Sequence, residues 1–273
     1  MSTQRMSDRV AVTAAGGGVV EVALSRADKM NALDPAMFDG LIEAAHAVRG
    51  MSGVRAVVLH GEGRAFCAGL DMGSFAAMAD GQGTNMGNLL PREGSIANRA
   101  QQTAWLWRDL PVPVIAAVHG VAFGGGLQVA MGADLRYTQA ETQWSILEIK
   151  WGLVPDMAGM PLLRELVRGD VLRDLTYSGR VVKGVEAQAL GLATHVVDDP
   201  LVAARAMAAQ IAGRSPHAVR AGKRLLNALS DHTAAQLLQA ETDEQVALIG
   251  SRNQVEAIHA GVQKRAPQFQ EAD

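Results

Sequence analysis

The chain has 273 residues and contains a single cysteine, Cys67. One cysteine excludes an intrachain disulfide and is typical of a protein from a reducing compartment. No apolar run reaches the ~18 residues that a membrane span needs. The polar N-terminus lacks the apolar core of a signal peptide. These absences predict a cytoplasmic protein with no membrane segment.

Excess charge of either sign is also lacking, since the net charge is −3 and acidic and basic residues are mixed along the chain. Without a basic stripe or arm, nucleic acid is not expected as a partner. The seven histidines form no pair at metal-ligand spacing, so no metal site is predicted. Both the G-K-[ST] ending of a P-loop and the G-x-G-x-x-G dinucleotide fingerprint are missing.

What is present is an ordinary globular composition, 48% apolar, on a chain long enough for one large core or a core with an appendage. Strand-like and helix-like runs alternate, which favours an α/β fold with a parallel sheet and crossover helices. A hairpin turns at Gly16–Gly18, and Asp34 caps a helix that begins at Pro35 and ends at Gly50. The other strands are expected at 54–59, 112–118, 135–138, 142–145 and 194–197, and the other helices at 95–109, 124–131, 162–167, 171–177, 185–190 and beyond 200.

The sequence makes three further structural predictions, for residues 72–94, for Trp105 and for residues 200–273. Residues 72–94 lack a periodic pattern and predict a mobile loop that covers a pocket. Trp105 is expected in the core. The amphipathic helices of 200–273 break near 215–216 and 230, and they are expected to pack on the core or on a neighbouring subunit.

Two glycine-rich turns carry the strongest chemical signal. They lie 57 residues apart, F-C-A-G-L-D at 66–71 and F-G-G-G-L at 123–127, and each follows an apolar strand. The second opens a helix, whose first N–H groups lack partners and favour an anion. Two N–H groups that converge on a thioester carbonyl would hold the oxyanion of an enolate. For the second turn taken alone, tight strand–helix packing is the favoured interpretation.

Two carboxylates, Glu148 and Asp156, lie in an otherwise apolar stretch. Burial and mutual repulsion would raise the pKa of at least one of them, which suits acid–base chemistry. The alternative is an ordinary ion pair, for instance with Lys150 or Arg164.

Other polar residues leave more than one interpretation open. Gln128 lies about one helical turn after Gly125 and can face the same pocket, but an amide cannot act as a base. Asp71 is more consistent with a helix cap than with catalysis. Arg26 and Lys29 either bind the phosphates of a long cofactor or are solvated. Cys67 is interpreted as a small buried apolar residue rather than as a nucleophile.

In order along the chain, four blocks resemble the crotonase superfamily, the enoyl-CoA hydratase/isomerase family. The first, S-R-A-D-K-M-N-A-L at 25–33, departs from the family pattern at Ala27, where the family has proline. The others are the turn at 66–71, the V-H-G-V-A-F-G-G-G block at 118–126, and the acidic block at 148–159.

This resemblance implies a crotonase-like spiral of ββα units over 1–199 and a C-terminal helical trimerisation region over 200–273. It implies a homotrimer or a dimer of trimers, and an acyl-CoA substrate with no separate cofactor. By position, the oxyanion hole falls on the amides of Ala68 and Gly125. Gly69, Leu70 and Asp71 fall among the substrate-binding positions, as does Gln128.

One departure bears on the reaction. Hydratases of the family use two glutamates to activate water, and Gln128 stands at the first of these positions. Dienoyl-CoA isomerases of the family pair a glutamate and an aspartate at the positions of Glu148 and Asp156. The resemblance therefore favours double-bond isomerisation, with hydration or a CoA-binding pseudoenzyme as the alternatives.

Overall fold

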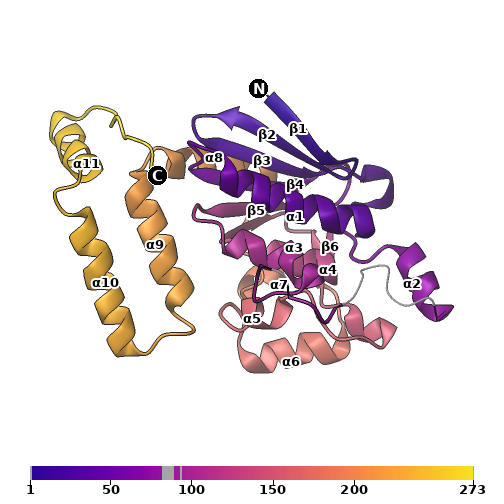
Figure 1. Cartoon of the computed structure of the whole chain (residues 1–273). Helices are drawn as coiled ribbons and strands as arrows, with labels where there is room; N and C mark the ends of the chain where they lie inside the picture. The colour runs from indigo at the N-terminus through magenta and orange to yellow at the C-terminus, as the bar shows by residue number, and fades with distance from the viewer. Residues whose placement is uncertain (1, 82–88, 93, 273) are drawn as a thin grey trace.

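A seven-stranded sheet forms the centre of the computed structural model, which describes residues 2–81, 89–92 and 94–272 (Figure 1). The strand order is β1-β2-β3-β4-β5-β7-β10. The first three strands pair antiparallel, and every later pairing is parallel. The strands are β1 (Ser2–Ser7), β2 (Val10–Gly16), β3 (Val19–Leu24), β4 (Ala56–Gly61), β5 (Val114–Val118), β7 (Leu135–Thr138) and β10 (His195–Val196).

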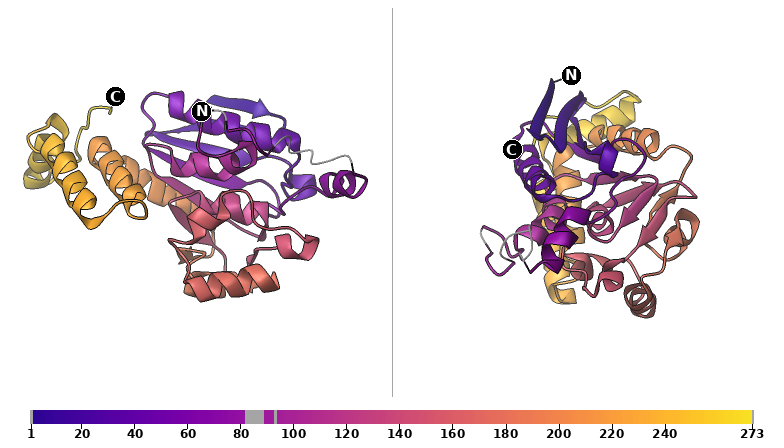
Figure 2. Two further views of the ribbon diagram at one scale, coloured as in Figure 1. Left: turned by 60° about the horizontal axis from the view of Figure 1, so that its bottom comes forward. Right: turned by 90° about the vertical axis from the view of Figure 1, so that its right-hand side faces the viewer.

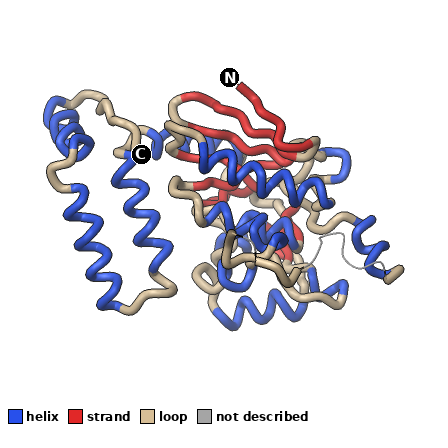
Figure 3. Tube along the Cα trace, in the orientation of Figure 1, coloured by secondary structure: helices blue, strands red, loops and turns tan. Residues whose placement is uncertain are grey.

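The parallel strands are buried on both faces, as crossover connections require. In β4, Val57 and Leu59 face the larger core beneath α1 (Pro35–Gly50) and α3 (Arg99–Arg108). The alternate residues, Ala56 and Val58, face α8 (Pro200–Ala212) on the other side of the sheet. Alanines at every fourth position of α8 allow this helix to approach the strands closely. Figure 3 shows the helices on either side of the strands.

A second, three-stranded sheet in the order β6-β8-β9 lies beyond the ends of the main strands. Its strands are β6 (Val121–Phe123), β8 (Gln143–Ser145) and β9 (Val182–Lys183). The remaining elements are η1 (Ala27–Lys29), α2 (Met72–Ala79), α4 (Gly125–Met131), η2 (Glu148–Trp151), α5 (Gly159–Leu163), α6 (Gly169–Ser178), α7 (Gly184–Ala189), α9 (Pro216–Ala228), α10 (Ala234–Leu248) and α11 (Arg252–Gln263). Among the described helices, none is both long and apolar enough to cross a membrane.

The C-terminal helices α9, α10 and α11 extend away from the sheet on the side opposite α2 (Figures 1 and 2). Lys223 anchors α9 to the core, since its buried ammonium donates to Asp134 over 2.8 Å and to the Val112 carbonyl over 2.9 Å. By contrast, α10 has no buried residue in the single chain.

Most of the predicted elements are confirmed, with three exceptions. Met72–Ala79 is the helix α2, not loop, because Asp71 caps it by accepting a hydrogen bond from the Gly73 amide over 2.8 Å. Residues 82–88 and 93 of the predicted loop lie outside the described residues. Strands β1 and β6 were not anticipated. The fully buried tryptophan of α3 is Trp107, whereas Trp105 is only partly buried against the core.

Asn31 fastens the turn after β3 to the end of β4. This residue is fully buried at φ 54°, in the left-handed region that asparagine tolerates. Its Oδ1 accepts from the Arg26 amide over 2.8 Å. Its Nδ2 donates to the carbonyls of Glu62 and Ala65 over 2.9 and 2.8 Å.

We expect Asn31→Ala to destabilise the protein by about 3 kcal/mol or more, because it leaves buried backbone groups unpaired and places alanine in a left-handed conformation. Thermal or urea unfolding measures the change. Asn227→Ala is the matched control, since the side chain of Asn227 donates a hydrogen bond of 3.0 Å to the Arg108 carbonyl. Equal losses of unfolding free energy in the two variants would contradict the role of Asn31.

Candidate active site

The two glycine-rich turns meet at the carboxyl end of the main sheet, although 57 residues separate them. The first follows β4, and the second follows β5 and β6. Cys67 pairs with β6: its amide donates to the Val121 carbonyl over 3.1 Å, and its carbonyl accepts from the Phe123 amide over 3.1 Å. These bonds confirm the expected convergence.

Glycine is required where the turns touch. Gly69 has φ 88°, and a Cβ there would lie 2.7 Å from the Phe123 carbonyl oxygen. Gly124 has φ 50° and ψ −120°, a conformation that L side chains avoid. The close approach of the two backbones therefore depends on residues without a side chain.

A cavity of about 230 Å³ opens between the turns. Ala68, Gly69 and Leu70 line it from the first turn, and Gly124 and Gly125 line it from the second. Apart from Glu148 and Asp156, its other walls are apolar. They are formed by Met72, Phe75, Met78, Leu89, Phe123, Leu147, Trp151, Leu153, Val154 and Met157. Phe75 of α2 stacks on Trp151 of η2 with ring centroids 4.4 Å apart, which closes one side.

The hydrogen bonds of the first turn correct one prediction. The Ala68 amide donates to the Met30 carbonyl over 2.9 Å, so it is not available to an oxyanion. The Asp71 amide donates to the Leu33 carbonyl over 3.1 Å. The Leu70 amide between them forms no hydrogen bond with the described residues, and Leu70 lines the cavity.

The Gly125 amide is also without a backbone partner in the described chain, because Gly125 is the first residue of α4. Gly124 precedes it and donates to the Ser145 carbonyl over 2.9 Å, which fixes the turn to β8.

Glu148 is the first residue of η2 and lines the cavity. Burial raises the pKa of its carboxyl group above the ordinary value, the hydrogen bond from Gln128 opposes this rise, and the charge of Asp156 adds to it. Its Oε2 is buried and has no hydrogen-bond partner among the described residues. A buried carboxylate oxygen in this state is typical of a functional group.

Asp156 lines the same cavity, and burial raises its pKa as well. Neither carboxylate forms an ion pair within the described chain. The proposed partners are used elsewhere: Arg164 pairs with Asp231 over 2.7 Å, and Lys150 lies over the Trp151 ring. The ion-pair interpretation is therefore wrong.

Gln128 does not line the cavity, contrary to the prediction. It is 1% exposed and lies behind Glu148. Its Nε2 donates to Glu148 Oε1 over 2.6 Å, and its Oε1 accepts from the amides of Met157 and Gly159. Both ends of this side chain are engaged with protein.

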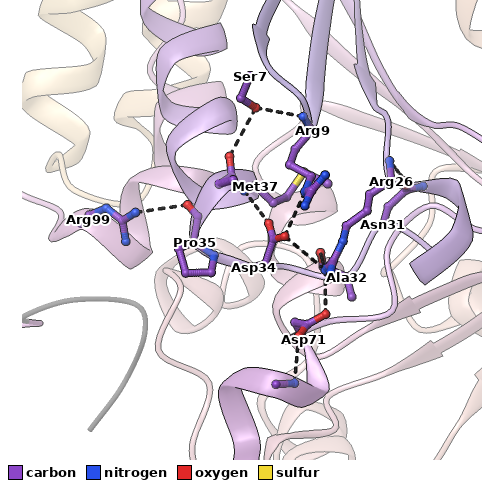
Figure 4. A network of polar contacts seen from close by, with 12 residues as sticks. Ser7, Arg9, Arg26, Asn31, Ala32, Asp34, Pro35, Met37, Asp71 and Arg99 are labelled. Atoms are coloured by element: carbon purple, nitrogen blue, oxygen red, sulfur yellow. Dashed lines mark hydrogen bonds and ion pairs between the residues drawn. The ribbon is translucent and has the colours of Figure 1, made fainter. Parts of the chain in front are cut away.

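Arg26 and Asp71 form an ion pair with each other (Figure 4). The guanidinium of Arg26 lies 2.6 Å from Asp71 and 3.5 Å from Asp34, and both of its partners are caps, of α2 and α1 respectively. Asp71 is absent from the cavity wall. The capping interpretation of Asp71 is thus confirmed, and Arg26 is a structural residue.

Lys29 remains a basic candidate, because it is exposed on η1 and no ion pair joins it to a described residue. Cys67 is fully buried, and its thiol donates to the Asn31 carbonyl over 3.1 Å. Burial raises the pKa of this thiol to about 12, so it is not a thiolate nucleophile.

Sequence reasoning missed the apolar wall that α2 contributes. The signal was present, since Met72, Phe75 and Met78 recur at three-residue intervals after a capping aspartate.

The profile of the family described as "Enoyl-CoA hydratase/isomerase" matches residues 14–272. The chain belongs to this family. Its fold is the mixed α/β crotonase fold of the solved enoyl-CoA hydratases. It is similar to the crystal structure of an enoyl-CoA hydratase from Polaromonas sp. JS666, with a TM-score of 0.83 and 29% identity over 96% of this chain and 99% of that one.

Curated relatives in the enoyl-CoA hydratase/isomerase family include different activities. The chain is 29% identical to the mitochondrial Delta(3,5)-Delta(2,4)-dienoyl-CoA isomerase of Mus musculus, over 94% of this chain and 80% of the relative. It is 28% identical to the mitochondrial methylglutaconyl-CoA hydratase of the same organism, over 92% and 79% of the two chains. Membership of the family therefore does not by itself select one reaction.

Proposed function

We propose that the protein shifts a double bond in an unsaturated acyl-CoA, with Glu148 and Asp156 as the proton-transfer pair. The observation that carries this proposal is two partly buried carboxyl groups, without an ion pair in the described chain, in the same cavity that two unused amides border. One carboxylate takes a proton from a carbon of the acyl chain, and the electron pair delocalises onto the thioester oxygen. The other carboxyl group returns a proton at a different carbon.

The oxyanion of this intermediate needs hydrogen-bond donors. We propose the amides of Leu70 and Gly125, in place of the predicted pair of Ala68 and Gly125. The Leu70 and Gly125 amides have no backbone partner in the described chain and border the same cavity. Lys29 is the proposed contact for CoA phosphate.

Among the described residues, the cavity offers an acyl chain apolar side chains and the turn backbones, apart from its two carboxyl groups. A polar group on the far part of the chain would lose its hydration there without a partner. This favours a hydrocarbon acyl chain as the substrate.

Hydration is the second candidate, supported by the hydratases among the relatives. It would need a group that holds water beside Glu148. Gln128 stands at that position, but both of its ends are bound to protein. This arrangement favours isomerisation.

In D2O, we expect the wild-type protein to introduce deuterium into a dienoyl-CoA during isomerisation, measured by mass spectrometry and NMR. Glu148→Gln and Asp156→Asn should each lower the rate by roughly 10²–10⁴, because each removes a general acid or base. Since burial raises both pKa values, the acidic limb of kcat/KM should lie above the ordinary pKa of the carboxyl group that acts as the base, 4.5 for Glu148 or 3.8 for Asp156.

Glu141→Gln is the control, because Glu141 is exposed on the approach to β8 and pairs with Lys183. Accumulation of 3-hydroxyacyl-CoA without deuterium at a remote carbon would select hydration instead. Binding of acyl-CoA without either product would select the pseudoenzyme.

Leu70→Pro removes one proposed oxyanion donor, and we expect kcat to fall by roughly 10²–10³. Leu70→Ala keeps the amide and should lose far less. Circular dichroism and unfolding curves check that the proline variant folds. Equal rates in the two variants would assign the donor elsewhere.

We also propose that 200–273 is an oligomerisation region, as expected for a homotrimer or dimer of trimers. Leu238 lies on α10, and Ile249 is the C-cap residue of this helix. Each is 64% exposed, and both lie on the same face, since eleven residues make about three helical turns. Other copies of the chain would cover this apolar face.

Light scattering should therefore give three or six times the 28.8 kDa chain mass. Leu238→Glu combined with Ile249→Glu should release smaller species, because it places charges on the apolar face. Gln239→Glu, on the polar side of the same helix, should not. A wild-type monomer would contradict the proposal.

A further inference from the structure

Gln128 has an unusual set of contacts for a side chain behind an active site. Its Oε1 accepts from the amides of Met157 and Gly159 over 2.8 and 2.9 Å. Its Nε2 donates to Glu148 Oε1 over 2.6 Å. A single amide group thus joins η2, which carries Glu148, to the segment that carries Asp156.

The backbone of that segment takes a strained form around the contact. Ala158, between the two donating amides, has φ 65°, which is uncommon for a residue with a side chain. Convergence of both amides on one oxygen stabilises this conformation. Asp156 directly precedes Met157, so the position of its backbone depends on the same oxygen.

The chemistry of the contact is specific for an amide side chain. The backbone amides of Met157 and Gly159 require a hydrogen-bond acceptor, and the Glu148 carboxylate requires a hydrogen-bond donor. A glutamate would place a second carboxylate oxygen against Glu148, and an apolar residue would leave two buried N–H groups unpaired.

We propose that Gln128 is the positioning residue that fixes the two carboxyl groups relative to each other and keeps Glu148, rather than Asp156, in the charged form. The proposal rests on the proposed function, in which both groups transfer protons. Glu148 receives a hydrogen bond that favours its carboxylate, whereas no side chain donates to Asp156 in the described chain. Glu148 is then the base and Asp156 the acid.

Hydrogen bonds from the backbone and from Gln128 oppose the effect of burial on the pKa of Glu148, and Gln128 is the side chain among these donors. Asp156 is the acidic group that acts on it, and its charge raises the pKa of Glu148. On α2, the cap Asp71 is neutralised by Arg26.

Helix α6 packs against η2, and its charged groups are bound elsewhere. Asp174 pairs with Arg180 over 2.8 Å, and Arg173 donates to the Gly169 carbonyl. On η2 itself, Lys150 lies over the Trp151 ring.

The test is the pH dependence of kcat/KM for isomerisation in Gln128→Met, a variant of similar volume. Loss of the donor removes stabilisation of the Glu148 carboxylate, so its pKa rises. The acidic limb should move to higher pH by about one to two units, the size of one lost hydrogen bond to a charged group. Gln102→Met is the matched control, since Gln102 is a buried amide on α3 that donates to the Ala97 carbonyl over 3.0 Å.

Gly159→Ala disturbs the contact without removing the glutamine. A Cβ at Gly159 would lie 2.6 Å from Gln128 Oε1 and must displace it. We expect this variant to shift the acidic limb in the same direction as Gln128→Met, which covers the case in which the methionine variant fails to fold.

A titration that needs no turnover completes the experiment. In protein labelled with ¹³C at the glutamate carboxyl carbon, the Glu148 resonance is assigned by its loss in Glu148→Gln. The pH midpoint of the Glu148 titration should rise in Gln128→Met or Gly159→Ala and should be unchanged in Gln102→Met. An unmoved midpoint in a folded variant, or an equal shift in the control, would overturn the positioning role. Absence of isomerisation in the wild type would overturn only the proposed function.

Discussion

The site depends on two backbone hydrogen bonds between Cys67 and β6. They join a turn that follows β4 to a turn that follows β5, at the edge where parallel strands end together. Gly69 then approaches the Phe123 carbonyl so closely that no side chain fits. Asn31 holds this assembly from behind through three hydrogen bonds. The pocket is therefore built from main chain, whose donors stay in place during a reaction.

Electrostatics gives the cavity its chemical character. Burying a carboxylate is costly, and folded proteins normally offset the cost with a cation. Here Arg26 neutralises Asp71 at the cap of α2, while Glu148 and Asp156 receive no cation within the described chain. A neutral amide, Gln128, is the side chain that contacts Glu148. Such a pair of carboxyl groups can differ in protonation, which proton transfer between two carbons requires.

Local sequence signals were reliable where short-range physics decides the outcome. The hairpin at 16–18, the helix that Asp34 and Pro35 begin, and the glycine turns all follow from backbone conformation. The helix α2 had a comparable signal in its aspartate cap and apolar spacing, but Gly73 and the glycines that follow the helix in the sequence concealed it. The burial of Cys67 also followed from its apolar neighbours. These features depend on contacts within a few residues.

The sequence by itself determined the family, the fold class and the presence of two carboxylates near two glycine turns. Only the tertiary structure decided which groups remain free for a substrate. The Ala68 amide is bound by Met30, and Gln128 is bound at both ends, whereas the Leu70 amide is left over. The reason is that each hydrogen-bonding group pairs with only a few partners. Here those partners come from segments roughly 20 to 40 residues away in the chain, and local sequence patterns carry no information over that separation.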